Sequence, residues 1–246
     1  MHTINNFFDH VYIINMVHDK DKLNIITARL SNYNIKYSIF KAIDGTHTPY
    51  REQYEAYKSR PFGYEGCHEL EFSLNKKVLS SYGSYGILKT MEQVFEDAQM
   101  HEYKNILTLQ DDIILCKDFN NKFDKSVSHV PLNWKIISLG VSQHIWRDVE
   151  FIPNINYYLS PHRTDGAFAT AFDHSIYNDV LNKIRKFNCN FDSGPLRDMY
   201  KKYPGSCYTL YPNLIIAQLD KSATQESRDM KKYSEKFKWN LNEYDL

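Results

Sequence analysis

The chain has 246 residues, of which 30 are basic, 30 are acidic and 42% are hydrophobic. This length suffices for one large α/β domain, which we expect to span residues 1–246. The balanced charge argues against nucleic acid as a partner, and no apolar run approaches the roughly 20 residues of an integral membrane segment. The start of the chain lacks the apolar core of a signal peptide, so we expect a cytoplasmic protein.

The first elements predict a nucleotide-binding α/β layer. Val11–Asn15 is a short β-rich run typical of a strand. One of the aspartates that follow can cap a helix, whose apolar residues recur at helical spacing as far as Leu30. Residues 35–42 alternate as a second strand before a turn at Asp44. This βαβ opening favours a Rossmann-like mixed sheet flanked by helices.

Residues 46–81 are less regular than the rest and contain two prolines and two glycines. We expect a loop with a short helix. A connection this long in a compact domain is often functional, which favours a lid or an insertion on the acceptor side of a site. A packed surface excursion explains the segment equally well.

Two glycines, Gly83 and Gly86, open the next predicted helix, which runs to Met100. Glycine lets the backbone approach a ligand closely, and a helix N-terminus is a natural place for phosphate. Close packing of the helix accounts for the same two glycines.

An apolar run, two acids and a second apolar run make up residues 105–115. In open α/β sheets ligands bind beyond the carboxyl ends of the strands, so these acids are candidates for a metal ion that carries phosphates. Because strand side chains alternate, Gln110 and Asp112 should share one face, with Asp111 on the other, where it would brace the loop. This geometry favours Asp112 as the ligand. A solvated turn or a helix cap is the alternative.

The second half of the chain continues the alternation of strands and helices. A Tyr-rich segment at 151–159 is a candidate for a hairpin with what precedes it, and Asp165 lies in a strand with the mixed small and aromatic residues of a pocket wall. Asp192 stands just before a helix, where it is either a functional acid or an N-cap. We expect strands at 134–139, 164–172, 207–211 and 214–217, and helices at 174–187, from Asp192 to near Lys202, and within 228–246.

Together these segments resemble glycosyltransferase family 25, the lipooligosaccharide and procollagen galactosyltransferase group, over most of the chain. The family's Q and its S-x-T-rich segment are similar to Gln218 and to residues 222–224. Its I-N-L looks like Ile14-Asn15-Met16, and its D-R looks like Asp21-Lys22. Its A-x-D-G looks like Ala42–Gly45, and its G-x-x-G-C-x-x-S-H looks like Gly83–Met91. Its E-D-D looks like Gln110-Asp111-Asp112, and its aspartate before a helix looks like Asp192. In this chain Gln110 replaces a glutamate and Met91 a histidine.

The resemblance implies a GT-A fold, a UDP-sugar donor, Mn²⁺ or Mg²⁺, and inversion at the anomeric carbon. A hexose, galactose or glucose, would pass to the hydroxyl of a glycan, a glycolipid or a hydroxylysine-type acceptor. Asp112 and Asp111 are the expected metal ligands, and Asp192, then Asp165, the expected general base. The donor side is expected to include Asn15, Asp44, Gly83, Gly86, Gln110, Asp111, Gln218 and Ser222.

Two other classes of function fit the same residues. One is a catalytically silent sugar-binding or nucleotide-binding protein that keeps the fold. The other is a metal-dependent nucleotidyltransferase or phosphohydrolase, which would release pyrophosphate or phosphate instead of UDP. The sequence carries no signal for the oligomeric state.

Overall fold

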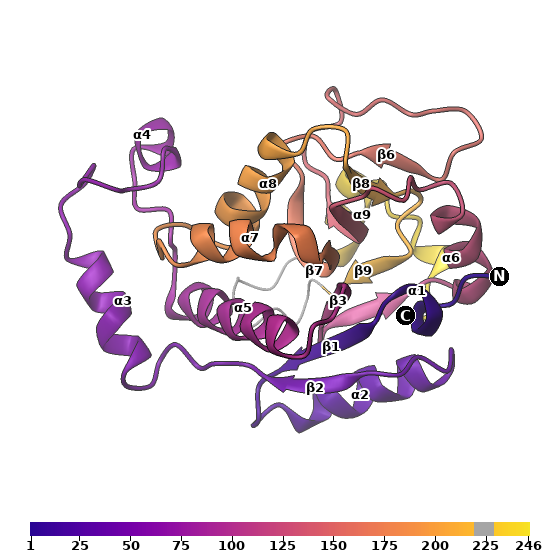
Figure 1. The fold of residues 1–246 in the computed structure, drawn as a ribbon, viewed down its shortest axis with the longest axis horizontal. Helices are drawn as coiled ribbons and strands as arrows, with labels where there is room; N and C mark the ends of the chain where they lie inside the picture. Colours follow the sequence, from indigo (N-terminus) through magenta and orange to yellow (C-terminus); the bar gives the residue numbers. More distant parts are fainter. Residues whose placement is uncertain (219–228) are drawn as a thin grey trace.

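The computed structural model describes residues 1–218 and 229–246, and within them the chain forms a seven-stranded mixed sheet flanked by helices (Figure 1). The strand order is β2-β1-β3-β7-β5-β8-β6. β1 is parallel to β2 and β3, β5 is parallel to β8, and β7 and β6 are antiparallel to their neighbours. This arrangement confirms the predicted α/β class. The strands are β1 (His10–Asn15), β2 (Ser38–Lys41), β3 (Asn105–Gln110), β5 (Ile136–Ser142), β6 (Tyr157–Leu159), β7 (Asp165–Asp173) and β8 (Cys207–Leu210).

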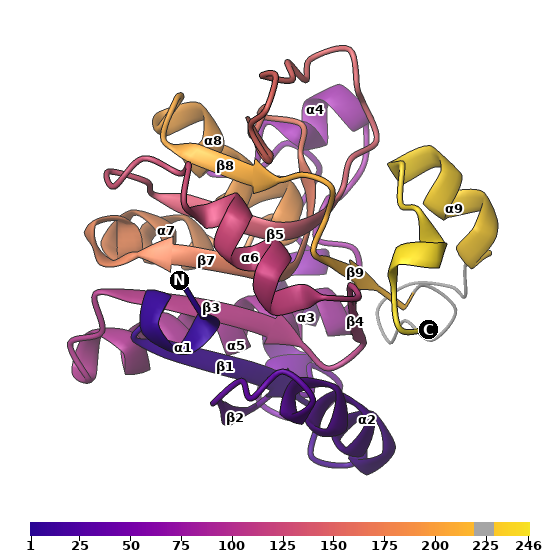
Figure 2. The ribbon, with the colours of Figure 1, turned by 90° about the vertical axis from the view of Figure 1, so that its right-hand side faces the viewer.

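Alternating side chains along the strands divide the core into two layers. In β1, Val11 and Ile13 face one layer and Tyr12 faces the other. The first layer is covered by α1 (Ile4–Phe7), α2 (Lys20–Ser31), α6 (Phe119–Val127) and α9 (Met230–Phe237). The second layer is covered by α3 (Tyr50–Lys58), α5 (Tyr82–Met100), α7 (Tyr177–Ile184) and α8 (Arg197–Lys202), so helices cover both faces of the sheet (Figure 2).

The βαβ opening is confirmed as β1, α2 and β2. Tyr12 lies opposite Ser38 in a parallel pair, and β3 joins β1 in parallel on its other side. The carboxyl ends of β1 and β3 therefore lie at one edge of the sheet. α5 begins at the predicted place because the Ser81 hydroxyl caps it, accepting a 3.1 Å hydrogen bond from the backbone N–H of Ser84.

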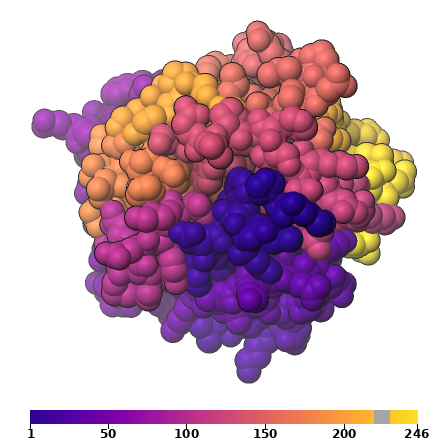
Figure 3. Space-filling view, turned by 45° about the vertical axis from the view of Figure 1, so that its right-hand side comes forward, coloured from indigo at the N-terminus to yellow at the C-terminus, as the bar shows by residue number. Residues whose placement is uncertain are grey.

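Residues 46–81 contain two helices, α3 and the short α4 (Leu70–Leu74), where the sequence predicted one. The α4 end projects from the body of the molecule (Figures 1 and 3). Tyr54 and Tyr57 anchor α3 in the α5 side of the core. Nδ2 of Asn188 also donates a 2.8 Å hydrogen bond to the carbonyl of Gly66, which ties the segment to the loop that precedes Asp192.

The predicted hairpin at 151–159 is wrong, because β6 pairs with β8 and not with the preceding strand. Both edges of β5 are already occupied by β7 and β8, so β6 adds to the free edge of β8. Helix α6 was not predicted from the sequence. Phe119, Phe123 and Val127 recur every four residues there and pack in the core, which is the pattern of an amphipathic helix.

The predicted run at 105–115 is two strands, because the acid pair interrupts it. After β3, β4 (Ile113–Leu115) leaves the main sheet and pairs with β9 (Ile215–Ala217) in a separate two-stranded sheet (Figure 2). The backbone N–H of Gln218 donates a 2.7 Å hydrogen bond to the carbonyl of Asp112. This small sheet therefore fixes the turn that carries the acid pair.

The ends of the described chain pack on the α6 side. The backbone N–H of His2 donates a 2.5 Å hydrogen bond to Asp124, and the ring of Phe7 contacts that of Phe123, so the first residues cover this face (Figure 3). The predicted C-terminal helix is shorter than residues 228–246, since α9 ends at Phe237. Within residues 1–218 and 229–246, no helix is long and apolar enough to cross a membrane.

Candidate active site

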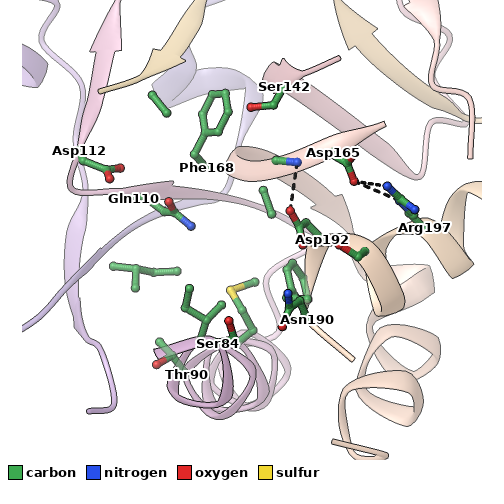
Figure 4. A pocket seen from close by; sticks show the side chains of 18 of the residues that line it. Ser84, Thr90, Gln110, Asp112, Ser142, Asp165, Phe168, Asn190, Asp192 and Arg197 are labelled. Carbon is green, nitrogen blue, oxygen red and sulfur yellow. Dashed lines mark hydrogen bonds and ion pairs between the residues drawn. The ribbon is translucent and has the colours of Figure 1, made fainter. Parts of the chain in front are cut away.

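A cavity of about 320 Å³ opens where β3 ends and β7 begins (Figure 4). Because these strands are antiparallel, the carboxyl end of β3 meets the amino end of β7 there. Ser84, Thr90 and Met91 of α5 line one wall, and residues 190–193 with Arg197 line the end nearest β7. Distant parts of the chain thus build one site.

The acid pair that follows β3 is divided between two environments. Gln110 and Asp112 line the cavity, whereas Asp111 does not. This is the division that the alternation of strand side chains predicts. The carboxylate of Asp111 accepts a 2.7 Å hydrogen bond from Nδ2 of Asn15, at the end of β1. Asp111 therefore joins the ends of two neighbouring strands.

Asp112 has an oxygen that is poorly compensated. Its Oδ1 atom is buried and has no hydrogen-bond partner among the described residues. Burial, followed by the neighbouring charge of Asp111, raises the pKa of Asp112 to about 6. An acceptor removed from both water and donors is costly, so this oxygen is a favourable place for a cation.

Lys22 of α2 offsets part of this negative charge. Its ammonium lies 3.2 Å from the carboxylate of Asp19. Partial burial favours the neutral amine, but the charges of Asp111, Asp19 and Asp112 outweigh it and raise the pKa of Lys22. Lys22 does not itself line the cavity.

Two further carboxylates meet at the opposite end of the cavity (Figure 4). Asp165, the first residue of β7, accepts hydrogen bonds from Arg197 at Nε (3.1 Å) and Nη2 (2.5 Å). Asp192 accepts a 3.4 Å hydrogen bond from the backbone N–H of Gly166 and a 3.0 Å bond from the Ser193 hydroxyl. Burial, and then the charge of Asp192, raises the pKa of Asp165 to about 6. The structure thus brings together the two acids predicted as candidates for the base.

Asp192 does not cap a helix. The helical turn Asp192–Leu196 follows Phe191 and has no side-chain cap. Its carboxylate instead reaches Gly166, whose φ of +88° is a left-handed conformation that disfavours any side chain. A Cβ at Gly166 would also lie 3.0 Å from the backbone nitrogen of Ser142. This glycine is therefore required for the N–H that holds Asp192.

Several residues of the cavity were not predicted from the sequence. Arg197 is the most important, and no local pattern indicates it because its partner is on another element. Ser84 and Asn190 also line the cavity, and Asn190 is bonded to Ser80 through both ends of its amide, at 3.1 and 3.2 Å. These bonds connect the start of α5 to the Asp192 segment.

Only some of the residues predicted for the donor side line the cavity. Gln218 lines the cavity with Gln110, whereas Ser222 lies outside the described residues. A Cβ on Gly86 would lie 2.4 Å from the carbonyl oxygen of Ile43, so close helix packing accounts for this glycine. The predicted residues that do not line the cavity are Asn15, Asp44, Gly83, Gly86 and Asp111.

Asp44 is held within its own turn. Its carboxylate accepts hydrogen bonds from the backbone N–H and the hydroxyl of Thr46, at 2.9 and 2.6 Å, and lies 3.2 Å from the ring of His47. These hydroxyl and backbone hydrogen bonds lower the pKa of Asp44. The interactions account for Asp44 as a turn residue.

A preformed cluster of three or more acidic, histidine or cysteine ligands is absent from residues 1–218 and 229–246. Of the two predicted metal ligands, only Asp112 faces the cavity, with the amide of Gln110 beside it. Mg²⁺ and Mn²⁺ typically take one or two carboxylates and complete their shells with phosphate oxygens and water. The donor set fits an ion that arrives with a phosphate-bearing ligand.

Comparison with known proteins identifies one family. The model described as glycosyltransferase family 25 (LPS biosynthesis protein) matches residues 8–186. The matched region includes the acid pair, α5 and Asp165, and it ends before Asp192. No curated protein matches the chain significantly.

Proposed function

The chain belongs to glycosyltransferase family 25, and on that premise we propose that it transfers a hexose, galactose or glucose, from a UDP-sugar to a hydroxyl group. The acceptor is a glycan, a glycolipid or a hydroxylysine-type side chain, and the anomeric carbon is inverted. One observation carries this proposal. A single cavity has an uncompensated carboxylate oxygen of Asp112 at one end and the carboxylate of Asp192 at the other.

The diphosphate of the donor is assigned to the end with Gln110 and Asp112. Two diphosphate charges cannot lie beside a carboxylate without positive charge between them. We assign Asp112 Oδ1, with the amide oxygen of Gln110, to hold Mn²⁺ or Mg²⁺. Such an ion, when bound, supplies positive charge beside the diphosphate as it leaves. Asp111 and Asn15 position the turn without touching the ligand.

Asp192 is assigned as the general base. The acceptor oxygen forms a bond to the anomeric carbon as the bond to the UDP oxygen breaks, and the acceptor proton passes to the Asp192 carboxylate. Asp165 is less suited to this step because both guanidinium hydrogen bonds of Arg197 converge on it. Among the residues that the structure describes, only the Ser193 hydroxyl and, at 3.4 Å, the backbone N–H of Gly166 donate to the Asp192 carboxylate.

Arg197 and Asp165 are assigned as positioning residues. Their ion pair joins the start of β7 to α8, and so fixes Gly166 relative to the Asp192 turn. The Arg197 cation also offsets the two carboxylates that meet there.

The test is UDP release from a panel of UDP-hexoses, with and without Mn²⁺, in the wild type and in Asp112→Ala. The proposal predicts metal-dependent release with one sugar and its loss in the variant. Asp148→Asn, at an exposed loop carboxylate, is the matched control and should retain activity.

The products separate this proposal from its rivals. The replacement of the family's glutamate by Gln110 removes a charge from the acidic end, which is the observation that favours a catalytically silent binder. Tight UDP binding without turnover, with every acceptor class supplied, would support that reading. Release of phosphate or pyrophosphate instead of UDP would support a hydrolase or nucleotidyltransferase.

A further inference from the structure

A second cavity, also of about 320 Å³, lies on the α6 side of the sheet. It is bounded by α6, by the turn between β8 and β9, and by the residues that follow α9. Its lining shares no residue with that of the first cavity. Its apolar surface comes from Cys116, Tyr211, Pro212, Leu214 and Tyr244.

Hydrogen bonds hold the walls of this cavity in place. The Tyr244 hydroxyl donates a 2.6 Å bond to the carbonyl of Asn213, whose own amide donates to the carbonyl of Val141 at 2.9 Å. The backbone N–H of Cys116 donates to the carbonyl of Leu214 at 2.9 Å. These bonds join three separate segments, so the cavity is preformed.

The rim of this cavity is basic. Lys122, Lys125 and Lys238 line it with a single carboxylate, that of Glu243. Glu243 is already engaged by Lys122, at 2.7 Å. Lys125 is exposed and has no carboxylate partner among the described residues. The ammonium of Lys238 lies 4.3 Å from the ring centre of Trp146 and forms no ion pair with a carboxylate of residues 1–218 and 229–246.

Groups suited to sugar hydroxyls lie beside these charges. Asn156 and Asn240, two residues with side-chain amides, line the same cavity. The ring of Tyr211 belongs to an aromatic group with Phe151 and Trp146, at centroid distances of 4.8 and 5.8 Å. Aromatic rings offer a flat apolar surface to the C–H face of a sugar, and amides bond its hydroxyls.

We propose that this second cavity binds an acidic saccharide unit, a sugar ring bearing a carboxylate or a phosphate, and so anchors the acceptor glycan away from the reacting hydroxyl. Lys125 and Lys238 bind the acid group, and Tyr211 with the two asparagines binds the ring. The role as an acceptor anchor rests on the proposed glycosyltransferase function. The binding chemistry itself depends only on this cavity.

Binding is tested by calorimetric titration of the full chain with three probes: a glucuronate-containing disaccharide, a hexose 6-phosphate and a neutral disaccharide. We expect the acidic probes to bind and the neutral one to bind at least tenfold more weakly. The stronger of the two acidic probes identifies the acid group. Because the contact is between charges near the surface, affinity should fall as salt is raised.

Lys125→Gln and Lys238→Gln should each lower the affinity for the acidic probe about threefold to tenfold, since a hydrogen bond to a charged group is lost at an exposed site. Lys20→Gln, at an exposed lysine of α2, is the matched control and should bind normally. None of the three residues lines the first cavity, so UDP release with water as the only acceptor should be unchanged in all variants. Failure of the catalytic proposal would therefore appear in a separate measurement.

Four results would overturn the proposal. One is equal affinity for neutral and acidic probes, and another is an equal loss in Lys20→Gln. The third is an amide chemical-shift map in which the acidic probe perturbs Gln110 and Asp192 instead of Asn156 and Tyr211. Absence of binding by every probe at millimolar concentration would also reject it.

Discussion

Replacing Asp112 with asparagine should stabilise the protein at neutral pH while removing its proposed metal ligand. The shape of the side chain is nearly kept, and the buried negative charge is lost. Burial raises the pKa of Asp112 from 3.8 to about 6. The native protein therefore holds a proton on this carboxyl more tightly than the unfolded chain does.

The sign and size of the effect follow from proton linkage. Below about pH 4 the carboxyl is protonated in both states and imposes no cost. Between about pH 4 and 6 the unfolded chain releases this proton while the native state retains it, so the wild type loses stability until the carboxyl is ionised in both states. Each pKa unit corresponds to about 1.36 kcal/mol, which makes the full penalty roughly 3 kcal/mol. Asparagine loses the attraction of Lys22, so we expect a net gain of about 1–3 kcal/mol above pH 7.

Urea denaturation of the wild type and Asp112→Asn at pH 4.5, 6 and 8, without divalent ions, measures this gain. The difference should be small at pH 4.5 and largest at pH 8, and Asp148→Asn should change stability by less than about 0.5 kcal/mol throughout. Added Mn²⁺ with UDP should stabilise the wild type and not Asp112→Asn. A variant less stable than the wild type at pH 8, or a gain independent of pH, would refute the reasoning about the buried charge.

Four further substitutions test other parts of the structure. Asp192→Asn should lower the rate of transfer by about 10²–10⁴-fold with UDP affinity unchanged, and near-normal turnover would remove Asp192 as the base. Gly86→Ala should cost about 1–3 kcal/mol of unfolding free energy, because its Cβ would lie 2.4 Å from a backbone oxygen. UDP affinity per folded molecule should not change, and a large loss would restore the phosphate-binding interpretation of this turn. Thr170→Val should be neutral or stabilising by up to about 1 kcal/mol, since its buried hydroxyl has no partner among the described residues. Thr108→Val, which removes a 2.9 Å bond to a backbone carbonyl, should instead cost about 1 kcal/mol; equal effects of the two in chemical denaturation would contradict this assignment.

Local patterns predicted the elements that frame the cavity. β1, β3 and α5 lie where the β-rich runs and the helical pattern that opens at Gly83 indicated them. Strand alternation also placed Gln110 and Asp112 on the same side. These features depend on neighbours within a few residues, and a single sequence contains that information.

Features that depend on contacts between distant parts of the chain could not be predicted from the sequence. The partner of β6 depends on which strand edge is left free, and a local pattern cannot show this. The ion pair of Arg197 with Asp165 joins two elements that are separate in the chain. Likewise, the acid pair after β3 looks like a solvated turn in sequence, whereas in the fold β4 pairs with β9 next to it and Asp112 Oδ1 is buried.

The antiparallel pairing of β3 with β7 fixes the distance between the two ends of the cavity. Leu109 lies opposite Ala169. The register of this strand pair, and not the length of any loop, therefore sets the separation between the acids after β3 and Asp165. Segments outside these two strands, such as 46–81 and 143–156, can therefore change length without altering that spacing. Deleting one residue within β7 would turn its side chains to the opposite faces of the sheet and separate the two halves of the site.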